Sequence, residues 1–211
     1  SREAGDVFDA NGHALACAVT DAGGQAFRVA AVPDELRALA DTIEDQLVRA
    51  DVLITTGGLS VGQGDTVKDV LAPLGSVRFD AVAMSPGRQL GVGTVEGTPI
   101  FCLPGDPVSA QIAFETFVRP VLRQIAGRTS LHRSSLPATI SEGWHSPSGK
   151  REFVPVRVSG SPSRGYRAEP TTPPGTVRLH GLSEANAIAV VPEDTSTVVA
   201  GDTLHCLLLD A

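Results

Sequence analysis

The chain has 211 residues, of which 42% are hydrophobic and 19% charged, and its formal net charge is −7. This length and apolar content are enough for one medium domain or two small ones with their own cores. The acidic balance argues against a general nucleic-acid surface, which would need a basic stripe, and no segment approaches the roughly 18 uninterrupted apolar residues of a membrane span. The N-terminus has no basic segment followed by an apolar core, so we expect a cytoplasmic protein.

The first half of the chain alternates helical and strand patterns. Helices are predicted from Asn11 to Gly23–Gly24, from Asp34 to Ala50, after Asp65 to near Gly75, and over Val108–Ala126 with a kink at Pro120. Strands are predicted over Phe27–Val32, Val52–Ile54, Val77–Val82, Leu90–Val95 and Ile100–Leu103, with a hairpin-type connection at Glu96–Pro99. Strands that alternate with helices imply a mostly parallel sheet covered on both faces, so we expect a three-layer α/β/α domain over residues 1–128.

The pattern changes from Arg128 onward. Proline, glycine and serine become dense, and short alternating runs occur at Glu152–Val158, Ala187–Val191 and Thr203–Leu209. Such runs are typical of a small all-β sandwich or barrel, which we expect over residues 129–211. The stretch Ser159–Gly165 is interpreted as an exposed loop.

The cysteines and histidines form no metal-binding pattern. Cys17, Cys102 and Cys206 lie far apart in apolar contexts, and no pair has Cys-x-x-Cys spacing. Buried thiols are therefore favoured over metal ligands. The histidines are also scattered and make no metal-type cluster.

Two strand-to-helix loops stand out in the first half. One runs from Thr55 to Gly62 with the sequence TTGGLSVG, and the other from Leu103 to Ser109 with the sequence LPGDPVS. Glycines let backbone N–H groups converge on an anion, and hydroxyl side chains add donors. Ligands of open α/β sheets bind beyond the carboxyl ends of the strands, so the two loops predict one anion site. A lone Gly-Gly pair fits a tight turn equally well.

These loops, together with Asp65 and the sequence MSPGR at Met84–Arg88, resemble the molybdopterin-binding domain of the molybdopterin molybdenumtransferase family. The gephyrin E domain belongs to that family. The resemblance begins at Val7–Asn11 and continues through Gly149–Phe153 and Leu182–Asn186 in the second half of the chain.

The resemblance implies an enzyme of molybdenum cofactor biosynthesis that inserts molybdate into adenylylated molybdopterin and releases AMP, with Mg²⁺ as cofactor. It implies catalytic roles for Asp34 and Asp65, with Asp65 as metal ligand. A homodimer is one possible assembly, although the family's usual dimer contacts lie largely in segments without a counterpart in this sequence. The charge and hydropathy predict no nucleic-acid or membrane partner. The substrate-binding residues that it implies are Thr56, Gly57, Gly58, Ser60, Arg88, Pro104, Gly105, Asp106 and Ser109.

Several of these residues also fit ordinary structural roles. Asp34 and Asp65 each precede a helix and would serve as N-caps, which stabilise a helix by about 1 kcal/mol. Ser60 and Ser109 are common turn and helix-start residues. Arg88 fits a solvated surface position as well as a bidentate contact with phosphate or molybdate.

The chain departs from the family pattern in three respects. Asp106 stands where the family usually has asparagine, which removes a donor and adds negative charge beside the proposed anion site. Ala81 and Ser85 stand where the family commonly has lysines. The chain also has no counterpart of the family's first strand, which ends in Thr-Gly-Asp-Glu, or of two earlier domains, so an exposed sheet edge is expected. The alternative function is therefore a truncated or diverged molybdopterin-binding module without turnover.

Overall fold

The computed structural model describes residues 8–59, 66–176 and 178–209. The chain divides into two compact units, the first within residues 1–80 and 89–131 and the second within residues 81–88 and 132–211. The segment 81–88 precedes the expected domain boundary in sequence, yet it belongs to the second unit. Within the described residues, no helix is both long and apolar enough to cross a membrane.

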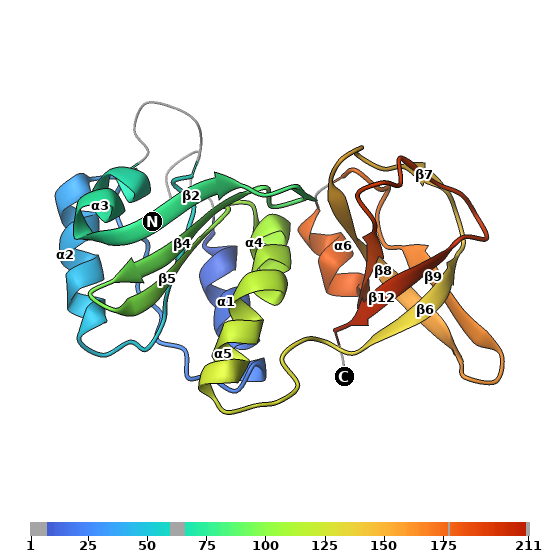
Figure 1. Cartoon of the computed structure of the whole chain (residues 1–211), viewed down its shortest axis with the longest axis horizontal. Coiled ribbons are helices and arrows are strands. Elements are labelled where there is room, and N and C mark those ends of the chain that lie inside the picture. Colours follow the sequence, from blue (N-terminus) through green and yellow to red (C-terminus); the bar gives the residue numbers. More distant parts are fainter. Residues whose placement is uncertain (1–7, 60–65, 177, 210–211) are drawn as a thin grey trace. The chain divides into compact units, whose positions relative to one another are not determined.

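The first unit is built on a sheet with the strand order β1-β5-β4-β2 (Figure 1). Its strands are β1 (Leu53–Thr56), β2 (Gly75–Ala81), β4 (Gln89–Val95) and β5 (Thr98–Leu103). β1 and β5 are parallel, whereas β4 and β5 form an antiparallel hairpin whose turn residues Glu96 and Gly97 have φ of 50° and 85°. The sheet is therefore mixed, and the three-layer, mostly parallel arrangement is not confirmed in that form.

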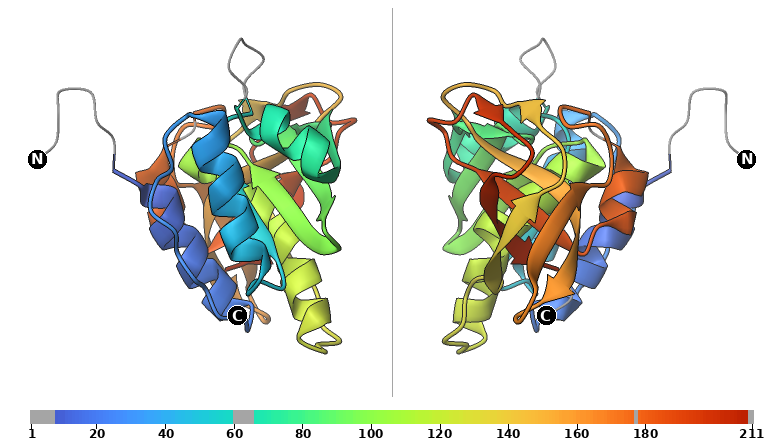
Figure 2. Two further views of the ribbon diagram at one scale, coloured as in Figure 1. Left: turned by 90° about the vertical axis from the view of Figure 1, so that its left-hand side faces the viewer. Right: turned by 90° about the vertical axis from the view of Figure 1, so that its right-hand side faces the viewer.

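Helices flank this sheet at the positions that the periodicity predicts. They are α1 (Ala10–Asp21), α2 (Leu36–Leu47), α3 (Thr66–Leu74), α4 (Pro107–Ala113), the π-helical turn η1 (Phe114–Val118) and α5 (Arg119–Ile125). Ile43 of α2 and Leu71 of α3 share a buried cluster with Ile100 and Cys102 of β5. The left view of Figure 2 shows α2 and α3 in front of the strands. Phe101 and Leu103 alternate with the clustered β5 residues and therefore face the opposite side of the sheet.

Two local predictions in this unit are wrong. The segment Phe27–Val32 is irregular, with Phe27 61% and Val29 42% exposed. A strand needs a neighbour for its backbone hydrogen bonds, and of the described strands none pairs with this segment. Asp34 does not cap the following helix, because α2 has Glu35 as its N-cap residue, without a described side-chain capping bond.

The long helix predicted over Val108–Ala126 occurs as α4, η1 and α5 in succession. Pro120 has no N–H to donate to the carbonyl of Thr116, and the backbone widens into the π turn just before it. The Thr116 hydroxyl donates a hydrogen bond to the carbonyl of Ile112 at 2.7 Å. Gly127, with φ of 69°, then ends the helix as predicted.

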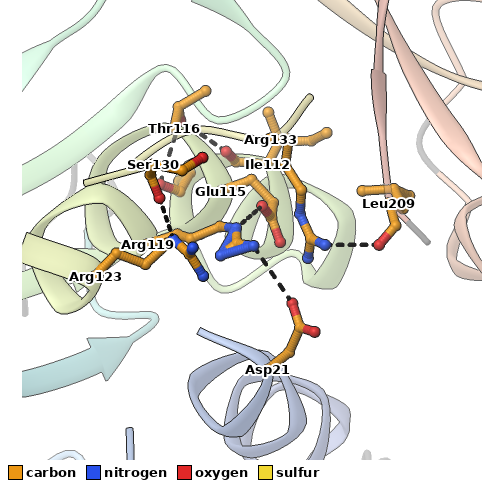
Figure 3. Close-up of polar contacts among 10 residues, drawn as sticks. Asp21, Ile112, Glu115, Thr116, Arg119, Arg123, Ser130, Arg133 and Leu209 are labelled. Atoms are coloured by element: carbon orange, nitrogen blue, oxygen red, sulfur yellow. Dashed lines mark hydrogen bonds and ion pairs between the residues drawn. The ribbon is translucent and has the colours of Figure 1, made fainter. Parts of the chain in front are cut away.

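Arg119 pairs with a buried carboxylate in this helical segment and with an exposed one at the end of α1 (Figure 3). The Nε of Arg119 lies 3.3 Å from the Oε2 of Glu115, and its Nη2 lies 3.8 Å from the Oδ2 of Asp21 at the end of α1. The side chains of Arg119 and Glu115 are only 6% and 8% exposed, whereas that of Asp21 is 54% exposed. The C-terminal end of α1 is therefore anchored to the segment that follows α4.

The second unit is a small β-barrel. Its strands are β3 (Met84–Ser85), β6 (Ser135–Ile140), β7 (Trp144–His145), β8 (Arg151–Ser161), β9 (Gly165–Pro170), β10 (Ala187–Val191), β11 (Thr197–Val198) and β12 (Thr203–Leu208), with helix α6 (Leu179–Glu184) between β9 and β10. The sheet order is β10-β12-β6-β9-β8-β3, and an additional pairing of β10 with β8 closes the barrel. Its core includes Ile140, Trp144, Val156 and Val191.

The barrel agrees with the predicted all-β unit and corrects one detail of it. The stretch interpreted as an exposed loop, Ser159–Gly165, is mostly a hairpin, because β8 extends to Ser161 and pairs there with the start of β9. The short helix α6 is not anticipated by the sequence pattern, since six residues are too few to show a helical period.

Candidate functional site

The two predicted loops meet at one edge of the first unit's sheet. β1 and β5 are parallel neighbours, and their last residues Thr56 and Leu103 are in register. Both strands therefore deliver their following loops to the same edge. The N–H of Gly57 donates a hydrogen bond to the carbonyl of Leu103 at 3.0 Å, which joins the loops directly.

Glycines occupy both loops where they face each other. A Cβ added to Gly105 would lie 3.3 Å from the Cα of Gly57, so the two backbones approach without intervening side chains. Gly57 and Gly58 also have φ of 85° and 66°, which other residues adopt only with strain. A Cβ on Gly58 would lie 2.5 Å from the Cγ2 of Val67 in the first turn of α3. Where Gly57 faces Gly105, the two loops thus meet backbone to backbone.

Asp106 acts as the N-cap of α4. Its Oδ1 accepts a hydrogen bond from the N–H of Ser109 at 2.8 Å, and Pro107 occupies the first turn, where no N–H partner is needed. Ser109 is buried, with 7% exposure. The Asp106 carboxylate, which replaces the family's usual amide, therefore caps α4. Its negative charge lies at the positive end of the helix dipole.

Helix α1 supplies a third contact to the site. The Nδ2 of Asn11 donates a hydrogen bond to the carbonyl of Gly105 at 2.8 Å, and Asn11 is 9% exposed. Asn11 belongs to the stretch Val7–Asn11 that carries the resemblance, but the sequence does not predict its contact with the loops. The available signal is its spacing of four residues from buried Leu15, which puts a polar side chain on the apolar face of a helix.

Thr56 and Pro104 directly precede the facing glycines, Gly57 and Gly105. Thr56 is exposed at the end of β1, and Pro104 is half-buried after β5. Asp34 is exposed in the segment before α2, and Arg88 is exposed in the second unit. Ser60 and Asp65 fall outside the described residues. The structure thus brings together Thr56, Gly57, Gly58, Pro104, Gly105, Asp106 and Ser109.

The ligand predicted for Mg²⁺, Asp65, lies outside the described part of the chain. Within it there is no group of three or more His, Cys, Asp and Glu side chains able to hold a metal ion. The carboxylate of Asp106, at the second loop, is engaged as a helix cap. Binding of Mg²⁺ by Asp65 therefore stays a prediction.

Two of the three thiols are buried, as predicted, and one is not. Cys102 and Cys206 have no exposed surface, while Cys17 is exposed on α1. Burial raises the pKa of both buried thiols to about 11, and for Cys102 a contact with the Thr55 hydroxyl offsets part of this rise. A thiol that stays protonated at neutral pH is a poor nucleophile and a poor metal ligand.

Comparison with known protein families assigns both parts of the chain. A family profile described as "Probable molybdopterin binding domain" matches residues 2–124. A second profile, described as "MoeA C-terminal region (domain IV)", matches residues 137–209. Together the two matches extend over nearly the whole chain.

The chain is similar to proteins known from sequence and from structure. "Molybdopterin molybdenumtransferase 2" from Mycobacterium tuberculosis is 36% identical over 207 residues, which cover 95% of this chain and 50% of the relative. "Gephyrin" from Dictyostelium discoideum is 28% identical over 204 residues, which cover 86% of this chain and 28% of the relative. The crystal structure of a molybdopterin biosynthesis moeA protein from Pyrococcus horikosii superposes with a TM-score of 0.84 at 26% identity, over 100% of this chain and 50% of that one. The chain spans about half the length of the first of these relatives and of the Pyrococcus protein.

Proposed function

The chain belongs to the molybdopterin molybdenumtransferase family, and from this premise we propose that its two glycine loops bind molybdopterin. The specific reaction proposed is the insertion of molybdate into adenylylated molybdopterin with release of AMP. The chain spans half of its curated relatives, so this activity is proposed for the chain and does not follow from the family alone.

The observation that carries the proposal is the contact between Gly57 and Gly105. Their loops leave the carboxyl ends of two parallel strands and meet backbone to backbone, with a Cβ on Gly105 placed 3.3 Å from the Cα of Gly57. A phosphate group is commonly bound where bare backbone N–H groups converge beyond strand ends. The hydroxyls of Thr56 and Ser60 would add donors for the same group.

Several parts of the proposed site rest on the resemblance alone. Asp34 and Asp65 as catalytic carboxylates, Arg88 as an anion contact, and Mg²⁺ held by Asp65 remain predictions. A homodimer is likewise a prediction, which analytical ultracentrifugation of the purified chain would test.

One further observation favours the binding module as the second candidate. Ala81 and Ser85 occupy positions where the family commonly has lysines, so cations expected beside the substrate's phosphates are replaced by neutral side chains. Loss of such charges weakens the stabilisation of a transferring phosphoryl group more than the binding of the pterin. The second candidate therefore binds molybdopterin without turnover.

Titration calorimetry and an AMP assay separate the two candidates. The chain is titrated with molybdopterin and with its adenylate, with and without Mg²⁺, and AMP is then measured after molybdate is added. We expect binding followed by molybdate-dependent AMP release. Binding without release would support the second candidate, and absence of binding to either ligand would contradict both.

A further inference from the structure

Asn11 holds one peptide group of the second loop in a fixed orientation. We propose that it is a positioning residue for the ligand of the two glycine loops. The identity of that ligand rests on the proposed function, whereas the orientation of the peptide group does not.

The geometry of the Gly105–Asp106 peptide bond determines the direction in which the Asp106 N–H points. The amide of Asn11 donates to the carbonyl oxygen of Gly105 at 2.8 Å, so this carbonyl points toward α1. The Gly105–Asp106 peptide is trans, and in a trans peptide the N–H lies antiparallel to the carbonyl. The N–H of Asp106 therefore points away from α1.

This peptide group is one that would otherwise rotate easily. Gly105 has no Cβ to restrict its backbone angles, and it is exposed. Rotation by half a turn would exchange the two groups, and a carbonyl oxygen would then take the place of the Asp106 N–H. A carbonyl repels an anion that an N–H attracts. The hydrogen bond from Asn11, 94 positions away in sequence, selects one of these two orientations.

Asn11 is itself held in place at the start of α1. The Oδ1 of Asp9 accepts a hydrogen bond from the N–H of Gly12 at 2.7 Å and caps the helix, and the Oδ2 of Asp9 lies 3.3 Å from the Nη2 of Arg28. A Cβ on Gly12 would lie 2.2 Å from the Oδ2 of Asp9, so a larger residue there would displace this carboxylate. At the other end of α1, Asp21 contacts Arg119. Helix α1, which carries the Asn11 donor, is therefore held by side-chain contacts at both of its ends.

Movement of Gly105 would also reach the first loop. The Cα of Gly57 would lie 3.3 Å from a Cβ on Gly105, and the Gly57 N–H is bonded to the carbonyl of Leu103, two residues before Gly105. A change in the Gly105–Asp106 peptide is thus expected to disturb the Gly57 N–H as well. Backbone N–H groups of both loops would therefore change orientation in the same variant.

The test compares Asn11→Ala with Leu15→Ala in the whole chain. Leu15 lies one turn further along the same buried face of α1, so its removal weakens helix packing while leaving the donor in place. The first readout is the ¹⁵N–¹H spectrum, which needs no ligand. We expect Asn11→Ala to shift the amide signals of Gly57, Gly105 and Asp106 and to speed hydrogen exchange of the Gly57 N–H by about tenfold. Leu15→Ala should leave these signals in place.

The second readout is the affinity for adenylylated molybdopterin, measured by calorimetry. Asn11→Ala should weaken binding by about tenfold, Asn11→Gln should restore part of it because the amide donor is kept, and Leu15→Ala should leave it unchanged. Unmoved amide signals in Asn11→Ala, or equal shifts in Leu15→Ala, would overturn the proposal. Shifted signals with unchanged affinity would reduce Asn11 to a structural role. Failure of the unaltered chain to bind would contradict the proposed function, while the amide signals would still decide whether Asn11 fixes the peptide.

Discussion

Cys102 illustrates how burial of one side chain couples stability to pH. It lies in β5 opposite Thr55 of β1, and burial raises the pKa of its thiol from an ordinary value of 9.0 to about 11. Between these two values the unfolded chain releases the thiol proton while the folded chain keeps it. The contribution of the Cys102 thiol to the free energy of unfolding is therefore fully present below pH 9 and is lost as the pH rises through 11.

We expect this titration to cost about 2 kcal/mol of unfolding free energy at pH 10.5. The measurement is urea unfolding at pH 8 and pH 10.5 for the unaltered chain and for Cys102→Ala. The variant loses packing at both pH values, so only the difference between the two pH values is compared. An equal difference in both proteins would mean that Cys102 does not cause the alkaline loss.

Gly57 and Gly97 form a matched pair for testing the loop contact. Both have φ of 85°, but only Gly57 lies at the loops, and a Cβ on Gly97 would meet no atom within 4 Å. Alanine at either position should cost about 1 kcal/mol of stability through backbone strain. Only Gly57→Ala should also weaken molybdopterin binding, by about tenfold or more in calorimetry. Similar affinities in the two variants would remove the first loop from the site.

Asp106 offers a substitution that separates helix capping from ligand binding. Asparagine caps a helix about as well as aspartate, so Asp106→Asn should leave thermal stability within about 0.5 kcal/mol, whereas Asp106→Ala should lose about 1 kcal/mol. Asp106→Asn also removes a negative charge at the second loop, and we expect tighter binding of adenylylated molybdopterin. Unchanged or weaker binding in Asp106→Asn would show that the charge does not oppose the ligand.

At the scale of elements, Arg119 at the start of α5 contacts two carboxylates. It pairs with buried Glu115 of η1 and with Asp21 at the end of α1. Arg119→Met should lower the free energy of unfolding by about 3 kcal/mol, because it leaves the Glu115 carboxylate buried at 8% exposure without its guanidinium. Asp21→Asn should change stability by less than about 0.5 kcal/mol, since Asp21 is largely exposed. Urea unfolding checks both values. The double variant Arg119→Met with Glu115→Gln should recover part of the loss, and failure to do so would assign the cost to packing instead.

Elements whose pattern is local were predictable from the sequence. Helices α1 to α5, the half-buried strand β1 and the mostly buried strand β5 follow their apolar patterns, and Gly127 ends the helical segment with a positive φ. Phe27–Val32 also alternates, yet it is irregular, because a strand depends on a neighbour that its own residues do not specify. The Glu96–Gly97 turn predicted a hairpin correctly, and that hairpin is what makes the sheet mixed.

At the scale of the whole chain, the meeting of the two loops was predictable because parallel neighbouring strands end at the same edge. The contact from Asn11 was not predictable, since it joins residues 94 positions apart through a single side chain. The assignment of residues 81–88 to the second unit was also missed. This assignment depends on the parallel pairing of β3 with β8, in which Met84 lies opposite Arg151. Nothing in the sequence of either strand indicates that the two strands pair.

The strand order also has a consequence for the sequence of events during folding. β4 and β5 are joined by a two-residue turn, and such hairpins form in about 1–10 μs. The pairing of β1 with β5 has to enclose α3, β2, β3 and β4, so its loop-closure entropy delays it. We therefore expect pulse-labelling during refolding to find the β4–β5 amides protected before the N–H of Gly57, which bonds to Leu103 only after β1 has docked. The glycine contact would then be a late event, formed once the sheet around it is already in place.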